Sequence, residues 1–166
     1  MAYLAPAEFV TKMVDAGESK LLMSTRDTLI RSYMAGATLA LAAAFAVTIT
    51  VNTGNALLGA VLFPVGFIML YLMGFDLLTG VFTLAPLAVL DKRPGATWGG
   101  VMRNWSLVFC GNFAGAFTVA VFMAIIFPFG FSEAPNAVGL KIGTIGEGRT
   151  VGYADHGAAG MLTLFI

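Results

Sequence analysis

The residue whose chemistry stands out is Asp76, the only charged side chain between Arg31 and Asp91. An aspartate at the centre of a membrane helix costs about 2.5–3.5 kcal/mol on insertion scales, and it usually faces a protein interior or a water-filled cavity. Glycines at positions 74 and 80 flank it, and glycine permits backbone conformations that break a helix. Gly74, Asp76 and Gly80 therefore predict two half-helices around a non-helical break at 74–80.

The carboxylate of Asp76 is suited to cap the half-helix that resumes at Leu77, because it can accept hydrogen bonds from free backbone N–H groups. The partial positive charge at that helix end would favour an anion at the break. The alternative is that Asp76 only stabilises the break and never contacts a substrate. Thr79 carries a hydroxyl that either faces the same lumen or bonds back to its own helix.

Two aromatic residues, Phe63 and Phe67, stand four positions apart on one face of the same apolar run. Pro64 and Gly66 lie between them and loosen the helix. This pair either narrows a pore or packs as ordinary apolar residues.

The elements that must position these residues are membrane helices. The chain has 166 residues, of which 58% are apolar and 11% charged, and its mean hydropathy is +0.88. Soluble domains are about a quarter charged. Positions 32–75 and 104–132 carry no charged side chain, and a bilayer span needs about 20 apolar residues. The composition therefore predicts an integral, all-α membrane protein with the lipid bilayer as its surroundings.

The same composition argues against several other classes. Nine basic and nine acidic residues cancel and form no basic cluster, so nucleic acid is not an expected partner. The single cysteine, Cys110, and the single histidine, His156, supply neither a paired metal site nor two histidine ligands for a haem. We expect no metal, no cofactor and no enzyme activity.

The order of the elements follows from the apolar runs and the turns between them. We expect an amphipathic helix and lead-in on the cytoplasmic side, a first span, a broken second span, a third span, an exposed extracytoplasmic loop, and the start of a fourth span. These segments are 1–31, 32–51, 56–90, 105–129, 130–157 and 158–166. The amphipathic helix lies on the membrane surface or packs under the protein itself, and the two are compatible.

The distribution of basic residues predicts the orientation. Seven of the nine lie before the first span or between the second and third spans, and only Lys141 and Arg149 lie in the 130–157 segment. Because cytoplasmic loops carry the excess of Lys and Arg, we expect a cytoplasmic N terminus. The protein is then a multi-pass protein of the cell membrane, whether plasma or inner membrane.

Four stretches of the sequence carry a family resemblance. Residues 63–80, FPVGFIMLYLMGFDLLTG, resemble the second-span signature of the formate/nitrite transporter family. Residues 103–116, RNWSLVFCGNFAGA, are similar to the beginning of that family's third span, with its Asn-Trp and Gly-Asn pairs. The N-terminal blocks PAEFV and ESKLLMS fit the family's surface helix and the lead-in to its first span.

The resemblance implies an aquaporin-like helical bundle, built as an inverted repeat, and a homopentamer with one pore in each protomer. It implies transport of small monovalent anions such as formate and nitrite. By position, Phe63 and Phe67 match the outer constriction, Leu77 and Leu78 match the inner one, and Thr79 matches a threonine facing a central histidine.

The chain departs from the family pattern at several positions. Phe75 stands where a small residue is usual and Leu78 where phenylalanine is usual, which leaves the preferred anion open. The family commonly has a lysine in the outer vestibule of the pore, just before the fourth span. His156 stands near that position, and it either replaces the lysine or is an exposed loop residue. The family's chains have about six spans, so this sequence is expected to be the N-terminal portion of a member, stopping early in the fourth span.

We therefore predict a transporter or channel for small monovalent anions. The leading alternative is a non-transporting or regulatory membrane subunit that assembles with a longer homologue. A water or glycerol channel would carry Asn-Pro-Ala tripeptides, which do not occur here. A membrane anchor of a redox enzyme would need haem or quinone ligands that one histidine and one cysteine do not supply.

Overall fold

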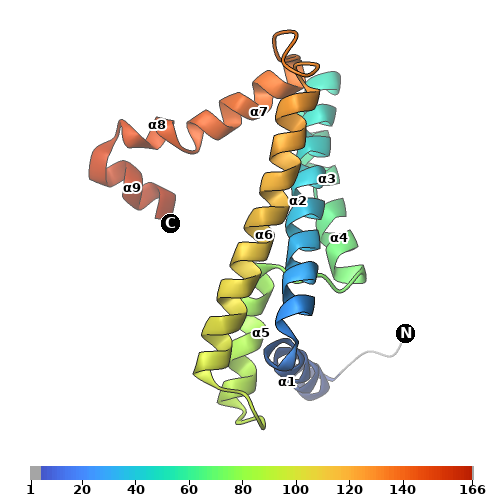
Figure 1. Cartoon of the computed structure of the whole chain (residues 1–166), viewed down its shortest axis with the longest axis vertical. Coiled ribbons are helices and arrows are strands. Elements are labelled where there is room, and N and C mark those ends of the chain that lie inside the picture. Colours follow the sequence, from blue (N-terminus) through green and yellow to red (C-terminus); the bar gives the residue numbers. More distant parts are fainter. Residues whose placement is uncertain (1–4, 166) are drawn as a thin grey trace. The chain divides into compact units, whose positions relative to one another are not determined.

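The computed structural model describes residues 5–165, and within them every regular element is a helix (Figure 1). The helices are α1 (Pro6–Leu22), α2 (Thr25–Thr53), α3 (Ala56–Leu62), α4 (Val65–Leu72), α5 (Leu78–Leu90), α6 (Trp98–Ile126), α7 (Ala137–Gly148), α8 (Val151–Ala154) and α9 (Gly157–Phe165). Of these, α2 and α6 are long and apolar enough to cross a membrane. The all-helical class expected from the composition is confirmed for the described residues.

The chain divides into two compact units, which are described separately. The first comprises Met1–Leu41 and Val65–Val119, and it holds α1, the beginning of α2, α4, α5 and most of α6. The second comprises Ala42–Pro64 and Ala120–Ile166. The glycine-flanked break and the residues around it belong to the first unit.

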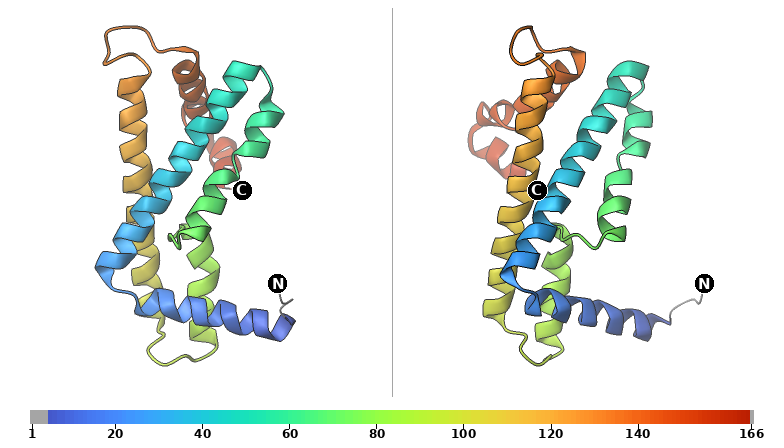
Figure 2. Two further views of the ribbon diagram at one scale, coloured as in Figure 1. Left: turned by 90° about the vertical axis from the view of Figure 1, so that its right-hand side faces the viewer. Right: turned by 45° about the vertical axis from the view of Figure 1, so that its right-hand side comes forward.

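In the first unit, the amphipathic helix α1 packs on α5 and runs across its direction (Figure 2). A Cβ atom added to Gly17 of α1 would lie 2.0 Å from the carbonyl oxygen of Leu84, so only glycine allows this approach. Leu21 of α1 joins a small core with Ala85, Ala88 and Val101. The apolar face of α1 thus covers the end of α5, while Phe9 and Val10 stay exposed.

Also in the first unit, α2 and α6 touch through their backbones. A Cβ atom added to Gly36 would lie 2.1 Å from the carbonyl oxygen of Asn112. One added to Gly111 would lie 1.9 Å from the Ser32 hydroxyl, and one added to Gly115 would lie 2.0 Å from the Tyr33 carbonyl oxygen. Small residues permit such close crossings of membrane helices. This contact fixes α6 against the first part of α2.

In the second unit, α3 folds back on the end of α2 after the turn at 54–55. The Asn55 side chain caps α3 by accepting from the Leu57 amide at 3.0 Å. Gly59 of α3 faces Thr50, whose hydroxyl lies 2.1 Å from the position of an added Cβ. The helix ends at Leu62, directly before the Phe63-Pro64 turn, because proline removes an amide donor.

The segment 130–157, expected as an exposed loop between spans, contains the helices α7 and α8. Asn136 starts α7 by accepting a hydrogen bond from the Gly139 amide at 2.9 Å. Gly139 packs against Phe127, whose Cβ lies 2.9 Å from the position of an added Cβ. Among the glycines of α7, Gly139 serves packing, whereas an added Cβ at Gly143, Gly146 or Gly148 would meet no atom within 4 Å.

Candidate functional site

The break in the second apolar run lies between α4, which ends at Leu72, and α5, which begins at Leu78. Gly74 has a φ of +69°, a left-handed conformation that glycine adopts without strain. Its amide donates to the Tyr71 carbonyl at 3.2 Å, and the Phe75 amide donates to the Leu70 carbonyl at 2.9 Å. These two bonds form the Schellman arrangement that ends many helices. The sequence Leu-Met-Gly-Phe therefore ends α4 by its own local geometry.

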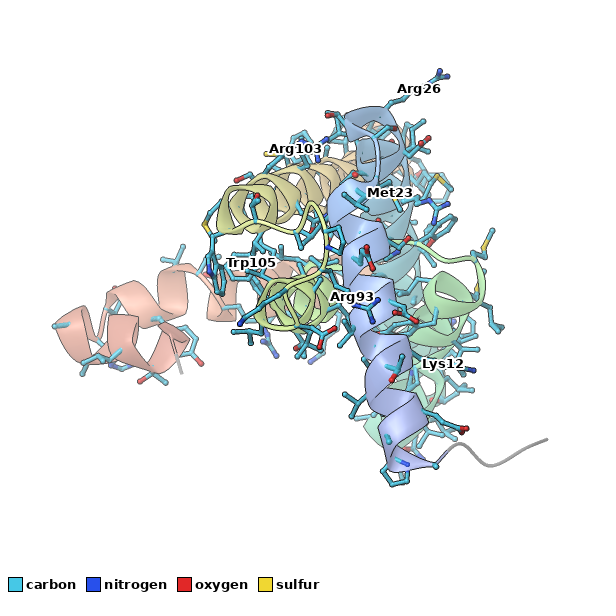
Figure 3. All side chains as sticks on the ribbon, turned by 90° about the horizontal axis from the view of Figure 1, so that it is seen from below. Lys12, Met23, Arg26, Arg93, Arg103 and Trp105 are labelled. Carbon is cyan, nitrogen blue, oxygen red and sulfur yellow. The ribbon has the colours of Figure 1, made fainter. Side chains whose placement is uncertain are left out.

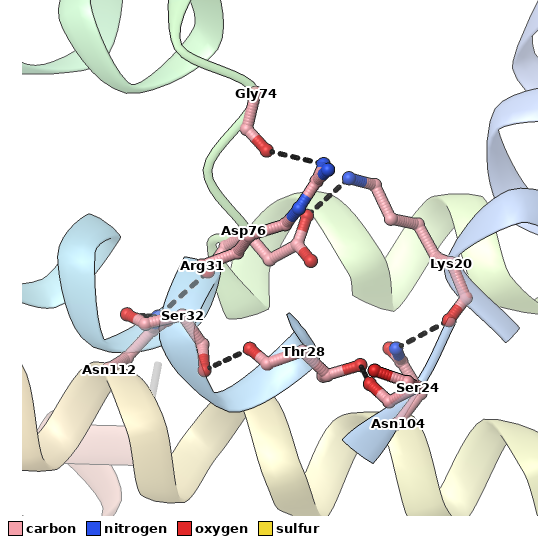
Figure 4. A network of polar contacts seen from close by, with 9 residues as sticks. All are labelled: Lys20, Ser24, Thr28, Arg31, Ser32, Gly74, Asp76, Asn104 and Asn112. Carbon is pink, nitrogen blue, oxygen red and sulfur yellow. Dashed lines mark hydrogen bonds and ion pairs between the residues drawn. The ribbon is translucent and has the colours of Figure 1, made fainter. Parts of the chain in front are cut away.

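Asp76 is buried in the break, with 2% of its surface exposed, and its Oδ1 atom pairs with the ammonium group of Lys20 (Figure 4). Lys20 comes from α1, and 18% of its side chain is exposed. The Oδ2 atom of Asp76 is buried and has no hydrogen-bond partner among the described residues. A buried carboxylate needs a nearby cation, since an unpaired charge is costly to bury.

The carboxylate of Asp76 does not cap α5, contrary to the sequence prediction. The residue before the helix is Leu77, and the first amide of α5, that of Leu78, donates to the Oδ1 atom of Asn112 at 2.9 Å. Asn112 lies on α6, and its Nδ2 atom donates to the carbonyl oxygens of Asp76 and Ser32, both at 2.8 Å. The cap comes from another helix, 34 residues away in sequence.

Arg31 of α2 also contacts the break, in addition to Asn112 of α6. The Arg31 guanidinium donates to the Gly74 carbonyl at 3.3 Å, and the Arg31 carbonyl accepts from the Asp76 amide at 3.4 Å (Figure 4). Sequence reasoning missed Lys20, Arg31 and Asn112 as parts of the site. A signal was present for Asn112, which is a polar residue in the uncharged apolar run 104–132.

The break lines a cavity of about 190 Å³ in the first unit. Its walls include Lys20, Asp76, Leu77 and Gly80. Leu78 faces a different hollow, an apolar groove of about 390 Å³ that it shares with Phe82 and Trp105. The two leucines expected to form one constriction therefore face two separate hollows of the first unit.

The other predicted pore residues lie at different levels of burial. Thr79, in the first turn of α5, is exposed. Phe67 of α4 and Phe63, at the C-terminal end of α3, are partly buried, and they belong to different units. His156 is exposed in the turn between α8 and α9.

The loop between α5 and α6 holds α1 through a cluster of charges. Arg93 pairs with Asp15 at 2.8 Å and with Glu18 at 3.5 Å, and its Nε atom donates to Asp91 at 2.8 Å. Figure 3 shows Arg93 beside α1. The hydrogen bond to Asp91 raises the pKa of Arg93 above its ordinary value, and the charges of Asp15, Asp91 and Glu18 add to this. Because the folded-state pKa of this base is raised, its contribution to stability is lost only at strongly alkaline pH.

Asn104 of α6 makes a further contact with α1. Its Nδ2 atom donates to the Lys20 carbonyl at 3.1 Å, and its side chain is fully buried. The Trp105 indole donates to the Val81 carbonyl of α5 at 3.1 Å. Within residues 5–165, no three His, Cys, Asp or Glu side chains gather in a way that could hold a metal ion.

Comparison with known proteins gives a consistent result. The family model described as "Formate/nitrite transporter" matches residues 7–166. A "Probable formate transporter" of Methanothermobacter thermautotrophicus is 29% identical over 98% of this chain and 60% of its own length. "Formate channel FocA" of Escherichia coli K12 is 32% identical over 72% of this chain and 43% of its own length. "Formate channel BtFdhC" of Bacillus thuringiensis is 28% identical over 72% and 48%.

The chain thus spans about half the length of these relatives. No solved structure matches it. Because the family model covers nearly the whole sequence and the helices α2 and α6 can cross a membrane, the chain is a membrane protein that belongs to the formate/nitrite transporter family.

Proposed function

We propose that this chain forms one part of a pathway that carries formate across the cell membrane, together with related small monovalent anions such as nitrite. The observation that carries the proposal is the interrupted apolar run of a family member, with a half-helix starting at Leu78 beside a lysine-paired aspartate. Irregular backbone at membrane depth is tolerated where it is buried in protein or lines a cavity. The role is transport rather than catalysis.

An anion near the break would meet favourable electrostatics at the start of α5. The N-terminal end of α5 carries partial positive charge from its aligned peptide dipoles. The ammonium group of Lys20 reaches the cavity that Leu77 and Gly80 also line, where the paired carboxylate of Asp76 offsets its charge. Thr79 is exposed in the first helical turn and can donate its hydroxyl proton to a carboxylate or nitrite oxygen.

Apolar side chains would restrict the pathway on both sides of this polar region. We assign Phe63 and Phe67 to an outer constriction and Leu77 and Leu78 to an inner one, where Leu77 borders the cavity at the break and Leu78 borders the neighbouring apolar groove. Hydrophobic constrictions exclude water and hydrated ions by dewetting. His156, exposed in the described structure, is assigned to the outer vestibule. We also propose that the protein has an aquaporin-like helical arrangement, built as an inverted repeat, and that it assembles as a homopentamer.

The test is formate flux into proteoliposomes that contain the purified chain, followed with radiolabelled formate. Thr79→Val removes the hydroxyl at constant shape and should lower formate flux roughly tenfold, the value of one hydrogen bond of about 1.4 kcal/mol. The control is Thr83→Val, the same change one turn further along α5 at another exposed threonine. Absence of formate flux from the unaltered chain would refute transport by the chain alone. Co-purification of the chain with a longer homologue would then favour the alternative, in which the chain is a non-transporting subunit.

A further inference from the structure

The non-helical segment between α4 and α5 is held mainly through its main chain. Helix termini and breaks leave backbone donors and acceptors that need partners when they are buried. The Gly74 and Phe75 amides use carbonyls of α4, and the Asp76 amide uses Arg31. The Asp76 carbonyl and the Leu78 amide, which lie on either side of Leu77 at the start of α5, both bind Asn112.

Asn112 uses its whole carboxamide in this contact. Its two N–H donors go to the carbonyl oxygens of Ser32 and Asp76 at 2.8 Å, and its oxygen accepts from Leu78 at 2.9 Å. One planar group therefore ties α6 to α2, to the break and to the first residue of α5. An aspartate has the acceptor but lacks these donors, and a leucine has neither.

The position of Asn112 is itself fixed by the helix crossing. The neighbouring Gly111 sits against the Ser32 side chain, and Gly36 of α2 sits against the Asn112 carbonyl. These close contacts set the distance between α6 and α2 at this crossing. The carboxamide of Asn112 therefore has a fixed position, and its hydrogen bond to Leu78 fixes the start of α5 relative to α6.

We infer that Asn112 is a positioning residue that fixes the placement of Leu78 and thereby sets the width of the inner constriction and its discrimination among anions. This inference rests on the proposed function for its consequence in transport. The placement of Leu78 depends only on the contacts described above. Asn112 does not touch the anion; it acts through the amide of Leu78.

The variants are Asn112→Leu and Asn112→Asp, and the matched control is Asn104→Leu. Asn104 is also an asparagine of α6, fully buried where Asn112 is partly buried, but it binds the Lys20 carbonyl of α1 and not the break. Asn112→Asp keeps the size and the acceptor of the side chain, so it preserves the packing. It replaces the N–H₂ group, which donates to two carbonyl oxygens, with an oxygen that cannot donate when the carboxylate is ionised. All variants are made in the full chain.

The first measurement is the rate at which a negatively charged thiosulfonate modifies Leu78→Cys in a Cys110→Ser background. Asn112→Leu and Asn112→Asp should each change this rate about fivefold or more, whereas Asn104→Leu should change it less than about twofold, since the loss of one anchoring hydrogen bond is worth about 1 kcal/mol. Equal rates in the Asn112 and Asn104 variants would overturn the positioning role. This readout does not require transport.

The second measurement is the ratio of formate to acetate flux in proteoliposomes. Both Asn112 variants should reduce the ratio about fivefold or more, in line with the same loss, while the Asn104 variant keeps it. Asn112→Asp should recover part of the ratio at about pH 5, where a protonated carboxyl group, partly buried and facing two carbonyl oxygens, regains one donor. An unchanged ratio with an active channel would overturn the inference. Absence of formate flux from the unaltered chain would instead refute the proposed function, and the modification rates would still decide the role of Asn112.

Discussion

At the scale of single residues, the buried carboxylate of Asp76 depends on one cation from a distant part of the chain. Lys20 lies 56 positions away, on a helix outside the apolar runs. The sequence shows that Asp76 is alone in its apolar stretch, but the spacing along the chain does not identify its partner. Only the crossing of α1 over α5, which depends on Gly17, brings Lys20 to the break.

Replacement of Lys20 tests this dependence. Lys20→Met keeps the length of the side chain but leaves Asp76 without a cation, and breaking a buried pair from one side costs about 3–5 kcal/mol. We expect the lower end of this range because Lys20 is partly exposed. The midpoint of thermal unfolding in detergent should fall by several degrees. Lys20→Met combined with Asp76→Asn should recover most of the loss, and a single variant as stable as the unaltered chain would contradict the pairing.

At the scale of elements, the sequence predicts where helices break better than where they begin. The break was expected at 74–80, and the structure places it between Leu72 and Leu78, so Gly80 lies inside α5. The signal is local, because Gly74 adopts a left-handed conformation that ends α4. By contrast, the cap of α5 comes from Asn112 on α6, and a local pattern holds no information about such a partner.

In the segment 130–157, the local sequence does not indicate the helices that form. Its glycines and polar residues are typical of a loop, but Asn136 caps a helix there. Glycine lowers helix propensity by about 1 kcal/mol relative to alanine, and tertiary contacts can outweigh that difference. Such contacts, as between Gly139 and Phe127, become visible only in the folded chain.

The seating of α1 on α5 gives a prediction at this scale. Gly17→Val would drive a side chain into the Leu84 carbonyl, so α1 should detach from α5. We expect amide hydrogen exchange over residues 6–22 to accelerate about tenfold or more, which corresponds to about 1.4 kcal/mol of lost docking. Gly143→Val serves as the control, since an added Cβ meets no atom within 4 Å at that helical position. Equal protection of α1 in both variants would argue against the glycine contact.

At the scale of the whole molecule, the distribution of charge predicts which side of the membrane each end faces. Arg26, Arg31, Lys92, Arg93 and Arg103 flank the beginnings of α2 and α6 or the end of α5. The segment after α6 carries Lys141 and Arg149 alone among basic residues. The positive-inside bias therefore favours a cytoplasmic N terminus.

Single cysteines introduced into a Cys110→Ser background test this orientation. Thr11→Cys and Ser132→Cys occupy exposed positions in the N-terminal helix and after α6, and neither change alters the charge. A membrane-impermeant maleimide added to intact cells should label Cys at position 132 and leave position 11 unlabelled. Permeabilised cells should show labelling at both positions. The reverse pattern in intact cells would show that the orientation is inverted.

The hydrogen bonds of the break have a consequence for how its lining can change. The hydrogen bonds that hold the break go to backbone groups, not to the side chains of Phe75, Leu77 and Leu78. They come from Asn112, Arg31 and the carbonyls of α4. Asp76 alone in this segment is held through its side chain as well. The conformation and the lining are thus specified by different atoms. Bulkier or smaller residues at 75, 77 and 78 can be exchanged within one unchanged backbone path, so the lining of the break can change without redesigning the fold.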